Sequence, residues 1–342
     1  AVGVPFKVPV PKAKLWSPTA PHLYDLKLSL SLGDRKADEV ASYFGMRSIS
    51  IGPDERGMPV LVLNGGKLFQ FGPLDQGYWP EGIYTAPTDE ALRSDIEMMK
   101  KFGFNFCHKH LKIEPERWYY WCDKLGLLVW QDMPSGDRVA PYGATEIERR
   151  PESARQFEAE MERMIAGRGN HPSIVMWVPF KAGWGQYDTA RVLAWAKALD
   201  PSRLVLGPGG SAYQGLADVQ ALGQGDFAPV PGAPAYVAQP RILAECGRIE
   251  VPVADHLWRK KGSRGFDQIY SPGQLGTEYL VRVISLVRTL AEAHGCCGAV
   301  FTQLTDVETE LTGLLTYDRE MKLDPGAIAE ANKKLWQPVV AR

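Results

Sequence analysis

The chain has 342 residues, of which 45% are hydrophobic and 23% charged, and its formal net charge at pH 7 is −1. These values are ordinary for a globular protein, while the near-neutral charge argues against a nucleic-acid partner and no apolar run is long enough to span a membrane. The five cysteines show no CxxC spacing and the first residues lack a signal-peptide pattern, so we expect reduced thiols and a cytoplasmic protein.

The first 52 residues are predicted to form β structure. Residues 22–30 and 40–49 each alternate apolar and polar positions, which is the pattern of a half-buried strand. Residues 1–52 are therefore predicted to be an all-β fragment.

From residue 53 onward, short apolar strands alternate with helical segments. Helices are predicted at 89–102, where Thr88 precedes a first turn with acids, and at 115–125. Such alternation indicates βα units, and eight strands predict a (β/α)8 TIM barrel over residues 53–342. The predicted strands are 68–73, 104–108, 127–131, 174–179, 204–207, 218–222, 241–245 and 299–303.

The active site of such a barrel lies at the carboxyl ends of its strands. That rule places a set of polar side chains around one pocket, although the fold alone does not decide the reaction. The set comprises Asp75, Gln76, His108, His110, Asp132, Lys181, Glu245, Gln303 and Asp306.

Several phrases of this sequence are specific. They are LWSP at 15–18, FGMR at 44–47, GPLDQGYWP at 72–80, WYYWCDKLGLLVWQD at 118–132, NHPSIVMWVPFKAGWGQYD at 170–188 and TQLTDVE at 302–308. With them the chain resembles glycoside hydrolase family 2, the β-galactosidase and β-glucuronidase group, over nearly its whole length. The resemblance implies an immunoglobulin-like sandwich before a TIM barrel. A whole sandwich of that type needs about 100 residues, so residues 1–52 would be a partial sandwich and the chain would be cut from a longer parent. The exposed edge of a partial sandwich would favour a homodimer, because unpaired strands recruit partners.

The resemblance also implies two catalytic carboxyl groups roughly 5 Å apart, one a nucleophile and one a proton donor. Glu245 stands at the nucleophile position. Ala182 stands where the family has its acid/base Glu, and Lys181 stands where the family has an Asn. Other positions also depart from the residues usual in the family. His108 stands where the family usually has Arg, and Phe301 where it has Tyr. Gly223 and Gly225 stand where it commonly has His-x-Tyr, and Ala212 where Trp is common.

These departures cluster at one pocket. Because they replace polar groups by small or apolar ones, they are expected to make the pocket larger and less accessible to water. Random drift would scatter changes over the surface, so the clustering favours an engineered or computationally redesigned site, with a natural degenerate relative as the alternative. Lys181 is then the leading catalytic residue. Burial disfavours the charged form of lysine, and a neutral amine attacks carbonyls to form a Schiff base, which suits retro-aldol cleavage. The alternatives are that Lys181 pairs with Glu245 or points to solvent.

Glu245 and the two histidines each have two interpretations. Glu245 is either a base whose pKa is raised by burial or an inherited residue that balances Lys181. His108 and His110 share a strand face and with Asp75 would form a metal triad, but hydrogen-bonded structural histidines are more common. We predict no metal and no other cofactor. The cysteines are expected to fill space rather than react.

The leading hypothesis is therefore a lyase-type amine catalyst acting on a small carbonyl substrate. The alternatives are an impaired retaining β-glycosidase with Glu245 as nucleophile, and a non-catalytic pocket for an apolar ligand. The predicted catalytic residues are Lys181 and Glu245. The predicted substrate-binding residues are Asp75, Gln76, His108, His110, Ala182, Trp184, Gly223, Cys246, Phe301 and Gln303.

Overall fold

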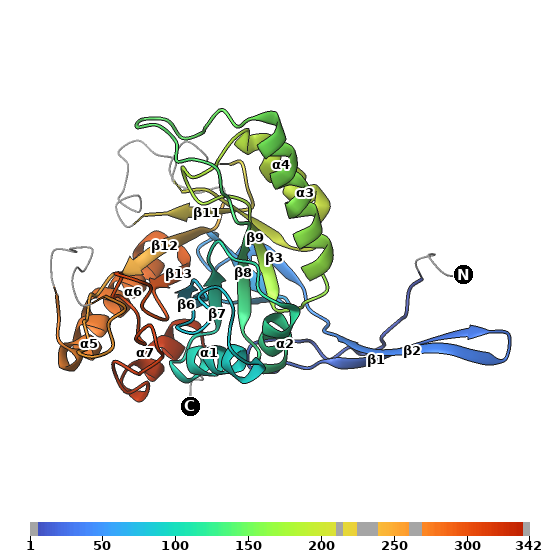
Figure 1. The fold of residues 1–342 in the computed structure, drawn as a ribbon, viewed down its shortest axis with the longest axis horizontal. Helices are drawn as coiled ribbons and strands as arrows, with labels where there is room; N and C mark the ends of the chain where they lie inside the picture. The colour runs from blue at the N-terminus through green and yellow to red at the C-terminus, as the bar shows by residue number, and fades with distance from the viewer. Residues whose placement is uncertain (1–5, 210–214, 224–238, 260–268, 338–342) are drawn as a thin grey trace.

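A computed structural model of the chain describes residues 6–209, 215–223, 239–259 and 269–337. At its centre, eight parallel strands close into a barrel in the order β10-β11-β12-β13-β6-β7-β8-β9 (Figure 1). All the predicted strands are confirmed, with shifts of only a few residues at their ends. They are β6 (Gln70–Asp75), β7 (Phe106–Lys109), β8 (Leu128–Asp132), β9 (Ile174–Val178), β10 (Leu204–Gly207), β11 (Val219–Leu222), β12 (Arg241–Gly247) and β13 (Cys296–Thr302).

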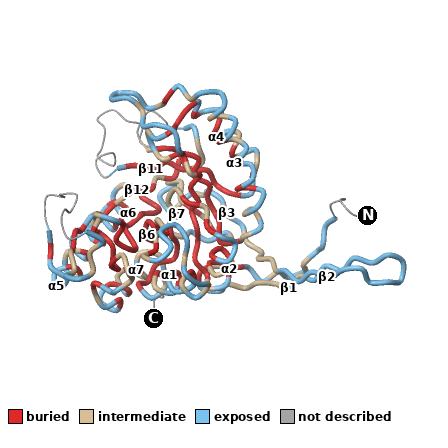
Figure 2. The backbone as a smooth tube through the Cα atoms, viewed as in Figure 1, coloured by how far each residue is buried: buried red, intermediate tan, exposed pale blue. Residues whose placement is uncertain are grey.

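The barrel strands are buried on both faces (Figure 2). In β8, Leu128 and Trp130 pack into the barrel interior with Phe106 of β7, while Val129 between them packs into the layer beneath the helices. This alternation follows from the period of two along a strand. It explains why the strands read as continuous apolar runs in the sequence.

Helices surround the barrel (Figure 1). The predicted cap of the first is confirmed, because the Thr88 hydroxyl accepts a hydrogen bond from the Ala91 N–H at 3.1 Å. None of the described helices combines the length and apolar character needed to cross a membrane. The helices are α1 (Asp89–Lys101), α2 (Glu116–Leu125), α3 (Pro151–Arg168), α4 (Thr189–Leu199), α5 (Pro272–Tyr279), α6 (Ser285–His294) and α7 (Gly326–Trp336), with a π-helical turn, η3 (Leu280–Ile284), between α5 and α6.

The N-terminal region contributes a hairpin and a small sheet. The hairpin of β1 (Tyr24–Leu32) and β2 (Arg35–Phe44) projects away from the barrel, and most of its residues are exposed (Figures 1 and 2). A second sheet consists of β3 (Ile49–Pro53), β4 (Pro59–Leu63) and β5 (Gly66–Lys67). Strand β3 therefore spans residue 52, the predicted boundary between the N-terminal region and the barrel.

That second sheet closes the amino end of the barrel. Leu61 and Leu63 of β4, together with Trp16, belong to the same buried cluster as Phe106 and Trp130 inside the barrel. Asn64 fixes this arrangement by donating a hydrogen bond from Nδ2 to the Trp16 carbonyl at 2.9 Å. Apolar side chains fill this end of the barrel, and the cavities among the described residues lie at the carboxyl ends of the strands.

Candidate active site at the carboxyl end of the barrel

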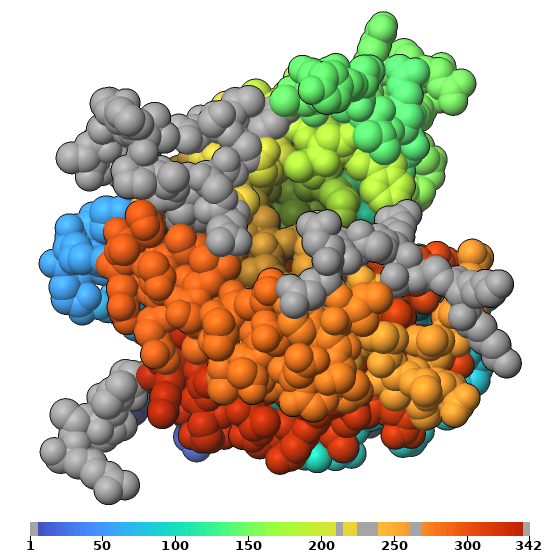
Figure 3. Space-filling view, turned by 90° about the vertical axis from the view of Figure 1, so that its left-hand side faces the viewer, coloured from blue at the N-terminus to red at the C-terminus, as the bar shows by residue number. Residues whose placement is uncertain are grey.

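Two adjoining cavities of about 310 and 160 Å³ open at the carboxyl ends of the strands. They share Leu74, His110, Lys181 and Glu245. Figure 3 shows this face of the molecule hollowed between yellow-green segments and orange segments. The larger cavity is also lined by Gln76, Arg248, Thr302, Glu310 and Thr312.

The two cavities differ in chemistry. The smaller one is lined on one side by His108 and Asp132 and elsewhere mainly by apolar or small residues, among them Val178, Phe180 and Ala182. The larger one carries two carboxylates and three basic side chains. The expectation of a less polar pocket therefore holds for the half beside Ala182 and is wrong for the half that contains Arg248 and Glu310.

Lys181 follows β9 in a tight turn. Its backbone N–H donates to the Ser135 hydroxyl at 3.1 Å, and its carbonyl accepts from the Trp184 N–H at 3.0 Å. Gly183 lies between them with φ of 71°, a conformation that favours glycine. The turn directs the amine into the pocket, where Nζ lies 3.0 Å from Nε2 of His110.

His110 connects Lys181 to a buried carboxylate. Its Nδ1 lies 3.3 Å from Oδ2 of Asp132, whose Oδ1 contacts Nε2 of His108. The Leu111 N–H donates to Asp132 at 3.0 Å. Burial alone would raise the pKa of Asp132, but the two histidines hold it well below its usual range. Asp132 therefore lies against both histidines, and His110 lies between it and Lys181.

Glu245 lies in β12 and is ionised more readily than a free glutamate. Burial opposes its charge, but a hydrogen bond from Arg248 and the nearby charges of Lys181 and His110 lower its pKa. The predicted rise in the pKa of Glu245 is therefore wrong in direction. The ion-pair partner of its carboxylate is Arg248, rather than Lys181 as in the alternative interpretation of that lysine.

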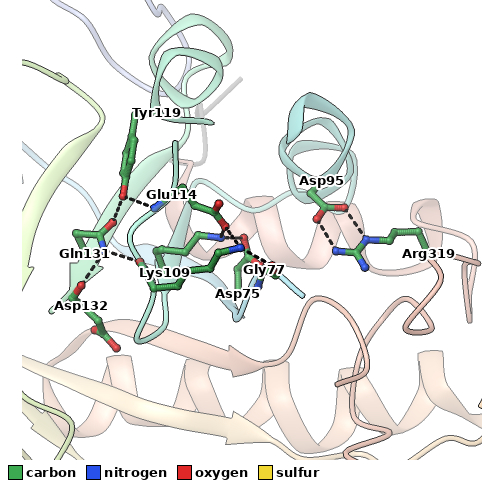
Figure 4. Close-up of polar contacts among 10 residues, drawn as sticks. Asp75, Gly77, Asp95, Lys109, Glu114, Tyr119, Gln131, Asp132 and Arg319 are labelled. Atoms are coloured by element: carbon green, nitrogen blue, oxygen red, sulfur yellow. Dashed lines mark hydrogen bonds and ion pairs between the residues drawn. The ribbon is translucent and has the colours of Figure 1, made fainter. Parts of the chain in front are cut away.

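Several predicted substrate-binding residues lie beneath the pocket rather than in its lining. Asp75 is buried in an ion pair with Lys109, Oδ2 to Nζ at 2.6 Å, so it does not join the histidines as a third ligand (Figure 4). Phe301 and Cys246 pack in the layer between barrel and helices, where burial raises the pKa of the Cys246 thiol. The Phe301 ring lies 5.0 Å from that of Tyr279.

The remaining predicted residues have mixed positions. Gln303 is buried and accepts a hydrogen bond from Gln76 at 2.8 Å, so it orients a residue of the lining. Trp184 is 37% exposed and pairs through its backbone with Val139. Gly223 is exposed just after β11, while Gly225 and Ala212 lie outside the described residues.

Sequence reasoning missed Arg248 and Glu310. Arg248 follows Glu245 by three residues, and its pairing with a carboxylate at that spacing was the available signal. Glu310 lies just beyond the TDVE phrase, and its Oε2 lies 3.4 Å from Nε2 of Gln76. Both residues lie on loops that follow strands, and residue propensities do not predict where the side chain of a loop residue points.

Comparison with known sequences bears on this site. A family profile described as "Glycosyl hydrolases family 2, TIM barrel domain" matches residues 85–221, and one described as "Glycosyl hydrolases family 2" matches residues 2–47. The chain belongs to glycosyl hydrolase family 2. The predicted family resemblance and barrel fold are thus confirmed.

Individual relatives agree with this assignment. The chain is 31% identical over 224 residues to the β-galactosidase of Lactococcus lactis, covering 63% of this chain and 21% of the relative. It is 32% identical over 219 residues to β-galactosidase 2 of Enterobacter cloacae, covering 62% and 20%. This family 2 chain therefore spans about a fifth of the length of these relatives.

Solved structures match more of the chain at lower identity. The family 2 β-galacturonidase of Eisenbergiella tayi superposes with a TM-score of 0.73 at 19% identity, covering 96% of this chain and 61% of that one. The β-glucuronidase of Parabacteroides merdae gives a TM-score of 0.67 at 18% identity, covering 95% and 43%. At such identities these matches show the fold.

Proposed function

We propose that this chain forms a covalent glycosyl ester on Glu245 with β-glycosides whose leaving group needs no proton. The observation that carries the proposal is the lowered pKa of Glu245, a carboxylate that lines a polar cavity at the carboxyl end of β12. A nucleophile must be ionised, and Arg248, Lys181 and His110 all favour that state.

The chemistry divides into two steps. In the first, a carboxylate oxygen of Glu245 attacks the anomeric carbon, the bond to the aglycone breaks and its electron pair leaves on the aglycone oxygen. In the second, water attacks the same carbon, the carboxylate leaves and the proton passes to solvent. Ala182 supplies no proton at the first step, so only a stable leaving group such as a nitrophenolate departs readily.

The comparisons suggest the sugar. The curated relatives are β-galactosidases, and the matching structures are a β-galacturonidase and β-glucuronidases. The basic residues Lys181, Arg248 and His110 line the larger cavity. Cationic groups there would suit a sugar that carries a carboxylate, so we include β-uronides beside β-galactosides among the substrates to be tested.

The test is intact mass after incubation with dinitrophenyl fluoroglycosides of galactose and glucuronic acid, which accumulate the ester. We expect one adduct on the parent, mapped to the peptide that contains Glu245, and none on Glu245→Gln. The matched control is Glu310→Gln, the other carboxylate in the same cavity, which should keep the adduct. An adduct on Glu245→Gln, or no adduct on the parent with either sugar, would contradict the proposal.

The second candidate is the amine catalyst predicted from the sequence, with Lys181 attacking a carbonyl. The observation in its favour is the chain from Lys181 Nζ through His110 to Asp132, with a first distance of 3.0 Å. A histidine in that place accepts a proton from the amine as it attacks, provided that its Nε2 is free of one. The apolar side of the smaller cavity offers room for a hydrophobic aldehyde.

This candidate predicts a reducible adduct. Incubation with an aromatic aldehyde and borohydride should add one mass increment to the parent, and Lys181→Ala should lose it. His110→Gln should slow its formation at neutral pH, because the amine would lose its proton acceptor. Surface lysines also condense with the aldehyde, and borohydride reduces those imines to stable amines, so an increment that survives Lys181→Ala would contradict a reactive pocket lysine.

A further inference from the structure

A three-residue cluster in the smaller cavity combines His110 and Asp132, which already lie in line with Lys181, with a second imidazole. It consists of His108, His110 and Asp132. His108 belongs to β7, His110 follows that strand directly, and Asp132 is the last residue of the adjacent β8. Each offers one ligand atom, and these atoms all lie within 4.8 Å of one another.

The cluster contains two buried ring nitrogens that have no hydrogen-bond partner among the described residues. Within the described part of the chain, Nδ1 of His108 and Nδ1 of His110 are buried and have no hydrogen-bond partner. Nδ1 of His110 nevertheless lies 3.3 Å from Oδ2 of Asp132, so a ring nitrogen and a carboxylate oxygen face each other without a good hydrogen bond. Buried polar atoms normally find partners, and a cation between these two atoms would satisfy both.

The ligand types define the ion. Two imidazoles and one carboxylate suit Zn²⁺, Co²⁺ and similar first-row cations rather than Ca²⁺ or Mg²⁺, which prefer oxygen ligands. Three protein ligands leave at least one coordination position open. That position would face the cavity, since all three residues line it beside Lys181 and Ala182.

The surroundings hold the cluster in place. The Leu111 N–H donates to Asp132 at 3.0 Å, and the side chain of Gln131 donates to the Asp132 carbonyl at 2.7 Å. Such outer contacts orient metal ligands and are as important as the ligands themselves. A separate contact, from Lys181 Nζ to Nε2 of His110, occupies the ring nitrogen opposite the one that faces Asp132.

We propose that His108, His110 and Asp132 bind one divalent transition-metal ion in the smaller cavity. The ion displaces the direct contact between His108 and Asp132, and it uses the His110 nitrogen that faces the carboxylate. This site differs from the triad considered from the sequence, in which Asp75 was the carboxylate. The structure supplies Asp132 instead, from a neighbouring strand.

The experiment is Co²⁺ titration of the full chain after chelator dialysis, followed by visible absorption, with Zn²⁺ competition and thermal unfolding as second readouts. We expect one equivalent of Co²⁺ to give ligand-field bands that Zn²⁺ removes, and Zn²⁺ to raise Tm. His108→Arg and His110→Gln should each weaken binding by about tenfold or more. His108→Arg places a hydrogen-bond donor beside Asp132, so that carboxylate keeps a partner in the variant.

The matched control is His256→Ala. His256 also contacts a carboxylate, Asp318 at 2.8 Å, but the pair is partly exposed and is not part of the cluster. This variant should bind Co²⁺ as the parent does. Binding that survives both pocket variants, binding that disappears in His256→Ala, or no band and no change in Tm would each overturn the proposal.

Discussion

Replacing Lys181 by Asn and Ala182 by Glu together is expected to raise kcat/KM for an alkyl β-glycoside by roughly 10²- to 10⁴-fold, the usual value of general acid catalysis. Ala182 and Glu245 line the same cavity, so a glutamate at 182 enters the space in which the glycosidic bond must break. Ala182 is exposed, and a longer side chain fits without displacing the core. Lys181 must change as well, since a neighbouring ammonium would keep the new carboxyl ionised and unable to donate its proton.

The matched control is Lys181→Asn with Ala182→Gln, which has the same shape without a titratable proton. This control should remain at the parent level on alkyl glycosides. On dinitrophenyl glycosides the two double variants should differ far less, because that leaving group needs no proton. Equal rates for the two variants on the alkyl substrate would mean that position 182 is not the missing donor.

The barrel was predictable because its strands are short, buried apolar runs separated by amphipathic helices. Ile174–Val178 and Leu204–Gly207 were placed with their observed bounds or close to them, since the same apolar side chains that mark a strand in sequence fill the barrel. Burial is a property of a whole segment, and a segment leaves a clear pattern in the sequence.

The site was predictable only in part, because the contacts of residues at strand ends and in loops depend on where their side chains point. The carboxyl-end rule placed Lys181, His110 and Glu245 at one pocket, and all three line it. The rule gave no means of choosing between Asp75 and Asp132 as neighbours of the histidines. Asp75 points beneath the pocket toward Lys109, whereas Asp132 points toward both rings. The hypothesis of deliberate redesign remains a prediction, since it depends on the origin of the sequence.

The buried network around Asp75 explains why that carboxylate is unavailable to a ligand (Figure 4). Lys109 bonds Asp75 at 2.6 Å and Glu114 at 2.9 Å, and all three side chains are at most 2% exposed. Asp75 also accepts the Gly77 N–H at 2.9 Å, and Lys112 donates to the Gly77 carbonyl. The network therefore fixes the turn that presents Gln76 to the larger cavity.

Opposed pKa shifts describe the same network. Burial would raise the pKa of Asp75, but Lys109 lowers it; burial would lower the pKa of Lys109, but Asp75 and Glu114 raise it. The contribution of Asp75 to stability is complete above its unfolded pKa of about 3.9 and is lost as pH falls through the native value. That of Lys109 is complete below about pH 10.4 and is lost as pH rises through its native value. The network is thus at full strength between about pH 4 and pH 10.

Lys109→Met is expected to lower the free energy of unfolding by about 3–5 kcal/mol at pH 7, because it leaves the buried Asp75 carboxylate without its paired cation, while Glu114 keeps Lys112 at 3.0 Å. The measurement is urea unfolding followed by tryptophan fluorescence. Lys67→Met removes an exposed pair with Glu55 and should leave the free energy of unfolding almost unchanged. As the pH falls, the free energy of unfolding of Lys109→Met should decrease less steeply than that of the parent, because protonating Asp75 no longer breaks an ion pair with Lys109. A loss as small as that of Lys67→Met would show that the buried Asp75 carboxylate finds another partner, and Asp75 would then be free to turn toward the pocket.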